Sequence, residues 1–130
     1  MRKLIRRWLP ALIWMGLIFL VSAQPSLPSV PGRWDLLLKK GMHMVAYGIL
    51  TILYLWALRG SAHDDRVVRV ASVVLALTYA LSDEYHQTFV PGRNGTWVDV
   101  AVDGVGILAA TVLDWWFVRR GCLEASQASG

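Results

Sequence analysis

The hydrophobic pattern of the chain consists of four long apolar segments separated by short polar ones. The apolar segments cover approximately residues 8–23, 42–58, 67–82 and 97–118, and their lengths approach or exceed the roughly twenty residues that an α-helix needs to cross a bilayer. Residues 24–34 are rich in proline, which opposes helix formation and favours an extended segment or turns. The pattern predicts an all-α membrane protein in which residues 1–130 form a single domain, a four-helix transmembrane bundle.

The first apolar segment has two interpretations. Its basic start, its short apolar run and the sequence Val21-Ser22-Ala23 before Gln24 are also typical of a cleaved signal peptide. The run is short for a membrane span. Composition alone does not separate a retained first helix from a removed one.

The overall composition favours a membrane protein. Hydrophobic residues make up 55% of the chain and charged residues 17%, whereas soluble domains carry about a quarter charged residues. The net charge of +4 does not indicate nucleic-acid binding, because the basic residues lie at the ends of apolar segments and form no basic helix face. The single cysteine excludes an intramolecular disulfide and a multi-cysteine metal cluster.

The distribution of basic residues predicts the orientation of the bundle. If four helices span the membrane, most of the lysines and arginines fall on one side, and this side is the cytoplasmic one. Both termini are therefore expected to be cytoplasmic, and the polar stretch between the third and fourth spans to be at the outer face. The basic residues on the predicted cytoplasmic side are Arg2, Lys3, Arg6, Arg7, Arg59, Arg66, Arg69, Arg119 and Arg120.

Two of the predicted helices carry stripes that should face protein rather than lipid. Polar residues recur at three- and four-residue steps along the second span, and polar stripes on membrane helices are normally buried in protein. The fourth span combines aspartates with small residues on one face, which lets helices approach closely. The two stripes are His43, Tyr47, Thr51, Tyr54 and Leu58 in the second span and Asp99, Asp103, Gly106, Ala110 and Asp114 in the fourth.

Residues 82–106 place acidic residues on both sides of an arginine, next to membrane-length apolar runs. Such charges are costly near a bilayer unless they are paired or functional. Glu84 and Gln87 share a helix face if the third helix continues beyond Ser82. The Asn94-Gly95 turn signal is expected to fold the Arg93 guanidinium back onto the carboxylates.

The motifs of the chain resemble those of the VanZ-like family, which is named for a teicoplanin-resistance protein. The resemblance rests on Ser22-Ala23-Gln24-Pro25, on Lys40-x-x-His43-x-x-x-Tyr47, and above all on Glu84-x-x-Gln87-x5-Arg93-x5-Asp99, followed by Gly106. It implies a small four-span protein and therefore favours a retained first helix. Two positions depart from the family pattern. Lys39 stands where the family often has aspartate, and Asp103 stands where it usually has asparagine.

Three classes of function remain open. The polar patch either recognises an envelope lipid headgroup or a lipid-linked glycopeptide, belongs to a membrane-embedded enzyme acting on an envelope lipid or phosphate group, or is a structural ion-pair latch. In the enzyme, Glu84 or Asp99 would be the base and Arg93 the clamp on a phosphate. The sequence assigns no cofactor, although His43 with Glu84, Asp99 and Asp103 offers ligands for a divalent cation. The candidate ligand-binding residues are Lys40, His43, Tyr47, Glu84, Gln87, Arg93, Asp99 and Asp103.

The expected partners follow from the first of these classes. They are membrane lipids and a lipid-linked cell-wall precursor or lipoglycopeptide, with no nucleic acid. The resemblance implies a multi-pass protein in the cytoplasmic membrane of a bacterium and a role in resistance to teicoplanin, and it does not define a reaction.

Overall fold

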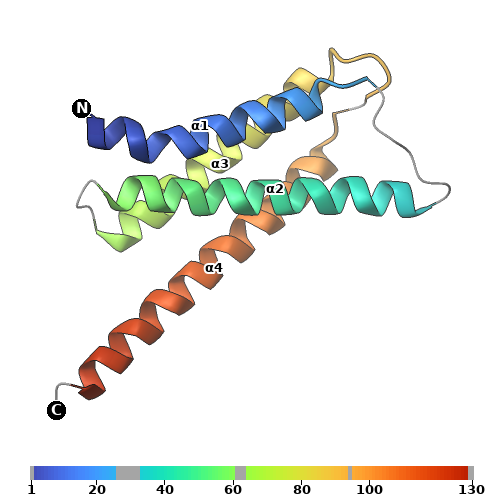
Figure 1. The fold of residues 1–130 in the computed structure, drawn as a ribbon. Helices are drawn as coiled ribbons and strands as arrows, with labels where there is room; N and C mark the ends of the chain where they lie inside the picture. Colours follow the sequence, from blue (N-terminus) through green and yellow to red (C-terminus); the bar gives the residue numbers. More distant parts are fainter. Residues whose placement is uncertain (1, 26–32, 61–63, 94, 129–130) are drawn as a thin grey trace.

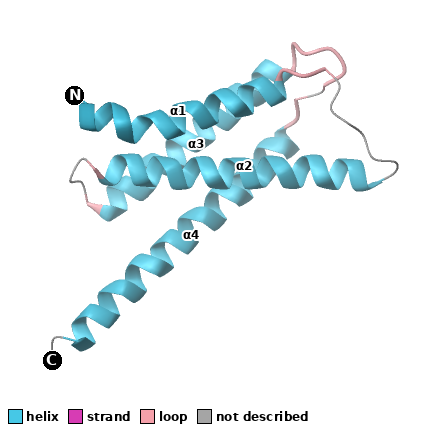
Figure 2. Cartoon of the chain, in the orientation of Figure 1, coloured by secondary structure: helices cyan, strands magenta, loops and turns pink. Residues whose placement is uncertain are grey.

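A computed structural model describes residues 2–25, 33–60, 64–93 and 95–128 of the chain. These residues form four helices: α1 (Arg2–Ser22), α2 (Arg33–Arg59), α3 (Asp65–Gln87) and α4 (Trp97–Ala128). No strand occurs in the described ranges (Figure 2). The all-helical, four-helix architecture predicted from the hydrophobic pattern is confirmed.

The helices are longer than the apolar segments that predicted them. α1 begins at Arg2 rather than near residue 8, α2 begins at Arg33 rather than near residue 42, and α3 continues through Gln87. Helical hydrogen bonding continues through polar flanks, so the end of an apolar segment does not mark the end of a helix. α3 has a defined start, because the Asp64 carboxylate accepts a 3.0 Å hydrogen bond from the Arg66 backbone N–H. Most of the predicted proline-rich loop, residues 26–32, lies outside the described residues.

Three of the four helices are long and apolar enough to cross a membrane. The qualifying segments are Lys3–Ser22, Leu37–Arg59 and Trp97–Gly121. α3 is not among them, since charged and polar side chains occupy both of its ends and leave too short an apolar stretch between them. A membrane span over residues 67–82 therefore stays a prediction.

Helix α2 lies at the centre of the arrangement. It packs against α1, α3 and α4, most extensively against α4, which crosses it (Figure 1). The end of α1, the start of α2 and the link between α3 and α4 lie toward one end of the bundle. The start of α1 and the last turns of α4 lie toward the opposite end (Figure 1). This arrangement agrees with the predicted clustering of the polar residues at one end, while the orientation of the termini relative to a membrane stays a prediction.

The crossing of α2 and α4 depends on two glycines. A Cβ atom added to Gly106 would overlap the backbone carbonyl oxygen of Met44, and one added to Gly48 would lie 3.3 Å from the carbonyl oxygen of Gly106. Absence of side chains at this point lets the two backbones approach closely. The side chains of Tyr47 and Ile107 next to the crossing are completely buried.

The predicted stripes face the interior of the bundle. Tyr47, Thr51 and Tyr54 are buried on α2, and Asp103 and Ala110 are buried on α4. Many large apolar side chains on the other helix faces are exposed. Exposed apolar faces of this kind are typical of helices surrounded by lipid.

Candidate functional site

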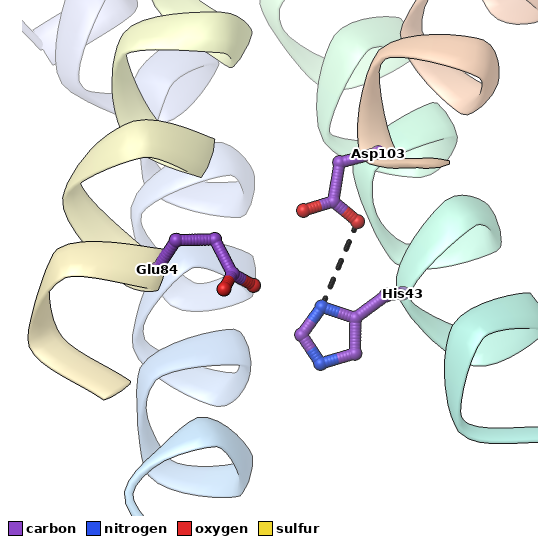
Figure 3. Close-up of side chains that lie close together, drawn as sticks. All are labelled: His43, Glu84 and Asp103. Atoms are coloured by element: carbon purple, nitrogen blue, oxygen red, sulfur yellow. Dashed lines mark ion pairs between the residues drawn. The ribbon is translucent and has the colours of Figure 1, made fainter. Parts of the chain in front are cut away.

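Three side chains from three helices converge at the end of the bundle where α3 joins α4. His43 comes from the first half of α2, Glu84 from the last turn of α3 and Asp103 from the second turn of α4 (Figure 3). His43 Nδ1 lies 3.6 Å from Asp103 Oδ1, which is within ion-pair range and beyond a hydrogen bond. Asp103 is completely buried, and neither of its carboxylate oxygens has a hydrogen-bond partner among the described residues.

Glu84 is held in place by the turn that follows α3. The Thr96 backbone N–H donates a 3.1 Å hydrogen bond to Glu84 Oε2, and the Gln87 side-chain amide lies 3.4 Å from Glu84 Oε1. Helix therefore continues beyond Ser82, and Glu84 and Gln87 share a face as predicted. Burial raises the pKa of Glu84 to about 7, and the negative charge of Asp99 adds to this effect while the Thr96 N–H opposes it.

A second pair of predicted residues forms the rim of this end of the bundle. Lys40 Nζ lies 2.8 Å from Asp99 Oδ1, and the Thr96 hydroxyl donates a 2.6 Å hydrogen bond to Asp99 Oδ2. Both charged side chains are about a quarter exposed. Lys40 and Asp99 thus neutralise each other, so a ligand that pairs with either charge must open this ion pair.

The expected position of Arg93 is wrong. Its guanidinium donates a 2.9 Å hydrogen bond to the backbone carbonyl oxygen of Ser22, and no ion pair joins it to a carboxylate within the described part of the chain. The Arg93 side chain reaches the end of α1 instead. Arg93 therefore ties the α3–α4 link to α1 and does not pair with the buried carboxylates.

Two residues of the site were missed by the sequence analysis. The buried Asp83 carboxylate accepts hydrogen bonds from the Ser22 hydroxyl (2.8 Å) and from the Gln87 amide (3.1 Å) through Oδ2, while Oδ1 has no partner among the described residues. The signal was present in the spacing, because Asp83 and Gln87 are one helical turn apart. Ser22 belongs to the Ser22-Ala23-Gln24-Pro25 motif, but nothing in its sequence position indicates a partner on α3.

Tyr47 lies one turn along α2 from His43 and is completely buried. The two rings are 6.3 Å apart between centroids, and the Tyr47 ring also contacts Tyr79 of α3 at 6.2 Å. The Tyr47 hydroxyl has no hydrogen-bond partner among the described residues. Tyr47 therefore forms the inner wall of the site and adds one more polar atom that faces it unpaired.

An apolar groove of about 730 Å³ runs between α1 and the first half of α2 and reaches this site. Its walls are almost entirely aliphatic and aromatic. Met42 and Val45 are more than half exposed, so the groove is open to the surroundings of the bundle. Its polar members are Ser22, Lys39 and His43, and Ser22 and His43 connect it with the cluster. The lining includes Trp14, Leu17, Ile18, Val21, Leu37, Leu38, Met42, Val45 and Ile49.

Comparison with known protein families identifies the chain. Residues 7–118 match the family described as VanZ/LLP1. The chain belongs to the VanZ/LLP1 family. No curated protein sequence and no solved structure matches the chain. The resemblance drawn from the motifs is confirmed, and the matched region contains every candidate residue of the site.

The VanZ/LLP1 site described above is rich in unpaired acceptors. Asp103 and Asp83 together present three carboxylate oxygens without hydrogen-bond partners in the described ranges. Buried acceptors without partners are costly, so the site favours a ligand that brings hydrogen-bond donors or positive charge. Amines, sugar hydroxyl groups and metal cations have this chemistry.

Proposed function

We propose that this VanZ/LLP1-family protein is a multi-pass protein of the bacterial cytoplasmic membrane that binds an envelope lipid or a lipid-linked glycopeptide at the outer face. The acyl chain of the ligand occupies the groove between α1 and α2, and its headgroup meets the polar cluster at the end of the groove. The observation that carries this proposal is the continuity of the groove with Ser22 and His43.

The groove has the size and chemistry of a ligand site. Its volume of about 730 Å³ lies within the range of roughly 300–1,000 Å³ that small-molecule sites occupy. An apolar lining gives an acyl chain a favourable surface without specific polar contacts. Charged groups do not interrupt the wall formed by Leu17, Ile18 and Val21 on α1.

The polar end of the groove matches a headgroup with donors. The cluster that adjoins Ser22 and His43 has carboxylate oxygens without partners, which accept hydrogen bonds from amines and hydroxyl groups. Phosphatidylethanolamine and lipoglycopeptides such as teicoplanin combine these donors with acyl chains. Teicoplanin binding would connect the site with the resistance phenotype after which the family is named.

A pair of glycine substitutions tests the groove. Gly41 lines the groove, and its Cβ position is open, whereas Gly16 on α1 has equally open surroundings and does not line the groove. Gly41→Leu places about four carbon atoms where the acyl chain would lie. Displacing even two methylene groups at about 0.8 kcal/mol each weakens binding by about tenfold or more.

The measurement is the binding of phosphatidylethanolamine with a fluorescent acyl chain to purified protein in detergent, with teicoplanin as competitor. We expect Gly41→Leu to weaken binding at least about tenfold, and Gly16→Leu to leave it within about twofold of the unchanged protein. Competition by teicoplanin would assign the glycopeptide as a ligand, and its absence would assign the lipid alone. Equal binding by the two variants would refute the groove as the site.

A further inference from the structure

His43, Glu84 and Asp103 have the arrangement of metal ligands. One ring nitrogen and one oxygen of each carboxylate all lie within 4.8 Å of one another. Each side chain comes from a different helix, and all three point into the same space (Figure 3). A site built across α2, α3 and α4 is fixed by the packing of the bundle rather than by a loop.

The unpaired state of Asp103 indicates a missing partner. Its side chain is 0% exposed, and both oxygens lack hydrogen bonds within the described residues. The His43 ring nitrogen next to it is also without a hydrogen bond there. Among the described residues only the His43 ring lies within ion-pair range of Asp103, and a buried carboxylate with incomplete compensation is unfavourable. A cation between Asp103, His43 and Glu84 would remove this penalty.

The distances suit a small metal ion. Tetrahedral ligands that lie about 2.0–2.2 Å from a metal are separated from each other by roughly 3.4 Å. The separation of 3.6 Å between His43 Nδ1 and Asp103 Oδ1 is close to this value. The Glu84 oxygen lies within 4.8 Å of the other two ligand atoms and would have to move inward to reach the same ion. Its hydrogen bonds to Thr96 and Gln87 hold the carboxylate in orientation, as outer partners do for metal ligands.

We propose that His43, Glu84 and Asp103 form a binding site for a divalent transition-metal ion such as Zn²⁺ or Mn²⁺. An imidazole nitrogen favours these ions over Mg²⁺ and Ca²⁺, which prefer oxygen ligands alone. Three protein ligands leave a coordination position for water or for an oxygen atom of a ligand. The site goes beyond lipid binding in the groove, and neither proposal requires the other.

The same chemical change at two positions on α4 tests the site. Asp103→Asn removes a proposed ligand charge, while Asp99→Asn removes the charge of the aspartate one turn earlier. Asp99 was also a candidate cation ligand from the sequence, but it pairs with Lys40 and is not part of the cluster that the structure forms. Both variants are made with Cys122→Ser and without a histidine tag, so that neither a thiol nor a tag binds metal. The full chain is purified in detergent, stripped with a chelator and titrated with Zn²⁺ and with Mn²⁺.

We expect the unchanged cluster to bind one equivalent of ion by calorimetry, with bound Mn²⁺ also detected by the loss of the free-ion electron paramagnetic resonance signal. Asp103→Asn should weaken binding by more than about tenfold, whereas Asp99→Asn should stay within about threefold. Glu84→Gln should behave like Asp103→Asn, which provides a second variant if one fails to fold. The proposal is overturned if the stripped protein binds neither ion, or if Asp99→Asn and Asp103→Asn lose equal affinity while both elute as folded protein.

Discussion

Replacing Gly106 with alanine tests the close crossing that places His43 beside Asp103. The added Cβ would overlap the Met44 carbonyl oxygen and lie 2.8 Å from the Met44 carbonyl carbon, whereas carbon atoms in contact prefer about 3.5–4.0 Å. The obstacle is backbone, so no side-chain rotation relieves it. α2 and α4 must therefore separate by roughly 1 Å at this point.

A nearby glycine on the same helix provides the control. A Cβ on Gly104 would lie 4.0 Å from Leu77 Cδ2, an ordinary contact. Both substitutions gain the same intrinsic helix preference of alanine over glycine, about 1 kcal/mol. Overpacking of a tight interface costs typically about 1–3 kcal/mol, and a backbone obstacle belongs at the upper end. Because the helix term is common to both, Gly106→Ala should be less stable than Gly104→Ala by about 3 kcal/mol.

Thermal unfolding in detergent measures this difference. The chain contains seven tryptophans, so its intrinsic fluorescence reports the melting of the bundle. A difference of about 3 kcal/mol corresponds to a decrease of roughly 10 °C in Tm for Gly106→Ala relative to Gly104→Ala. If the two variants melt within about 2 °C of each other, α2 and α4 do not approach as closely as described, and the crossing does not hold His43 beside Asp103.

Three further predictions concern other parts of the chain. Arg59→Gln leaves the Asp114 carboxylate without its two 2.6 Å hydrogen bonds, so we expect the free energy of unfolding, measured by heat or denaturant, to fall by about 1–3 kcal/mol. An unchanged Tm would show that the Arg59–Asp114 pair does not stabilise the protein. In chelator, the pKa of Glu84 is raised from 4.5 unfolded to about 7 folded, so the contribution of Glu84 to folding stability should be greatest below pH 4.5 and should fall by up to about 3 kcal/mol as pH rises through 7. Glu84→Gln should remove most of that slope, and an unchanged slope would assign it to another group. For topology, the native Cys122 thiol should not react with a membrane-impermeant thiol reagent in intact cells or spheroplasts. A cysteine introduced by Pro91→Cys on a Cys122→Ser background should react from outside, and the reverse labelling pattern would show that the predicted orientation is inverted.

The helices and their buried faces could be predicted because they depend on local periodicity. The step of three or four residues that places Tyr47 and Thr51 on one side of α2 is contained in the sequence itself. The same applies to Asp103 and Ala110 on α4. The helix ends could not be predicted as well. An apolar segment shows only which part of a helix lies in a hydrophobic environment, whereas α2 begins at Arg33 and includes polar residues before its apolar part.

The contacts of the site were predictable only in part. Spacing placed His43, Glu84 and Asp103 at one end of the bundle, and the structure brings them together. Spacing does not determine the direction of a side chain in a turn, so the sequence assigned Arg93 to the carboxylates, although it bonds to the Ser22 carbonyl. Asp83 was overlooked because its partner Ser22 is distant in the sequence.

The two ends of the bundle differ in how their charged side chains are paired, and this difference distinguishes a structural latch from a binding site. At the end that contains the start of α3, Arg59 forms two 2.6 Å hydrogen bonds with Asp114 and a 3.3 Å bond with Asp65, so opposite charges there are matched. This is what a latch requires: each charge has a partner within the chain. At the opposite end, Arg93 bonds to a backbone carbonyl oxygen, and neither buried oxygen of Asp103 has a hydrogen bond among the described residues. An ion-pair latch therefore accounts for Arg59 and Asp114, whereas the cluster of His43, Glu84 and Asp103 has the unmet acceptors expected of a site that is completed by a ligand.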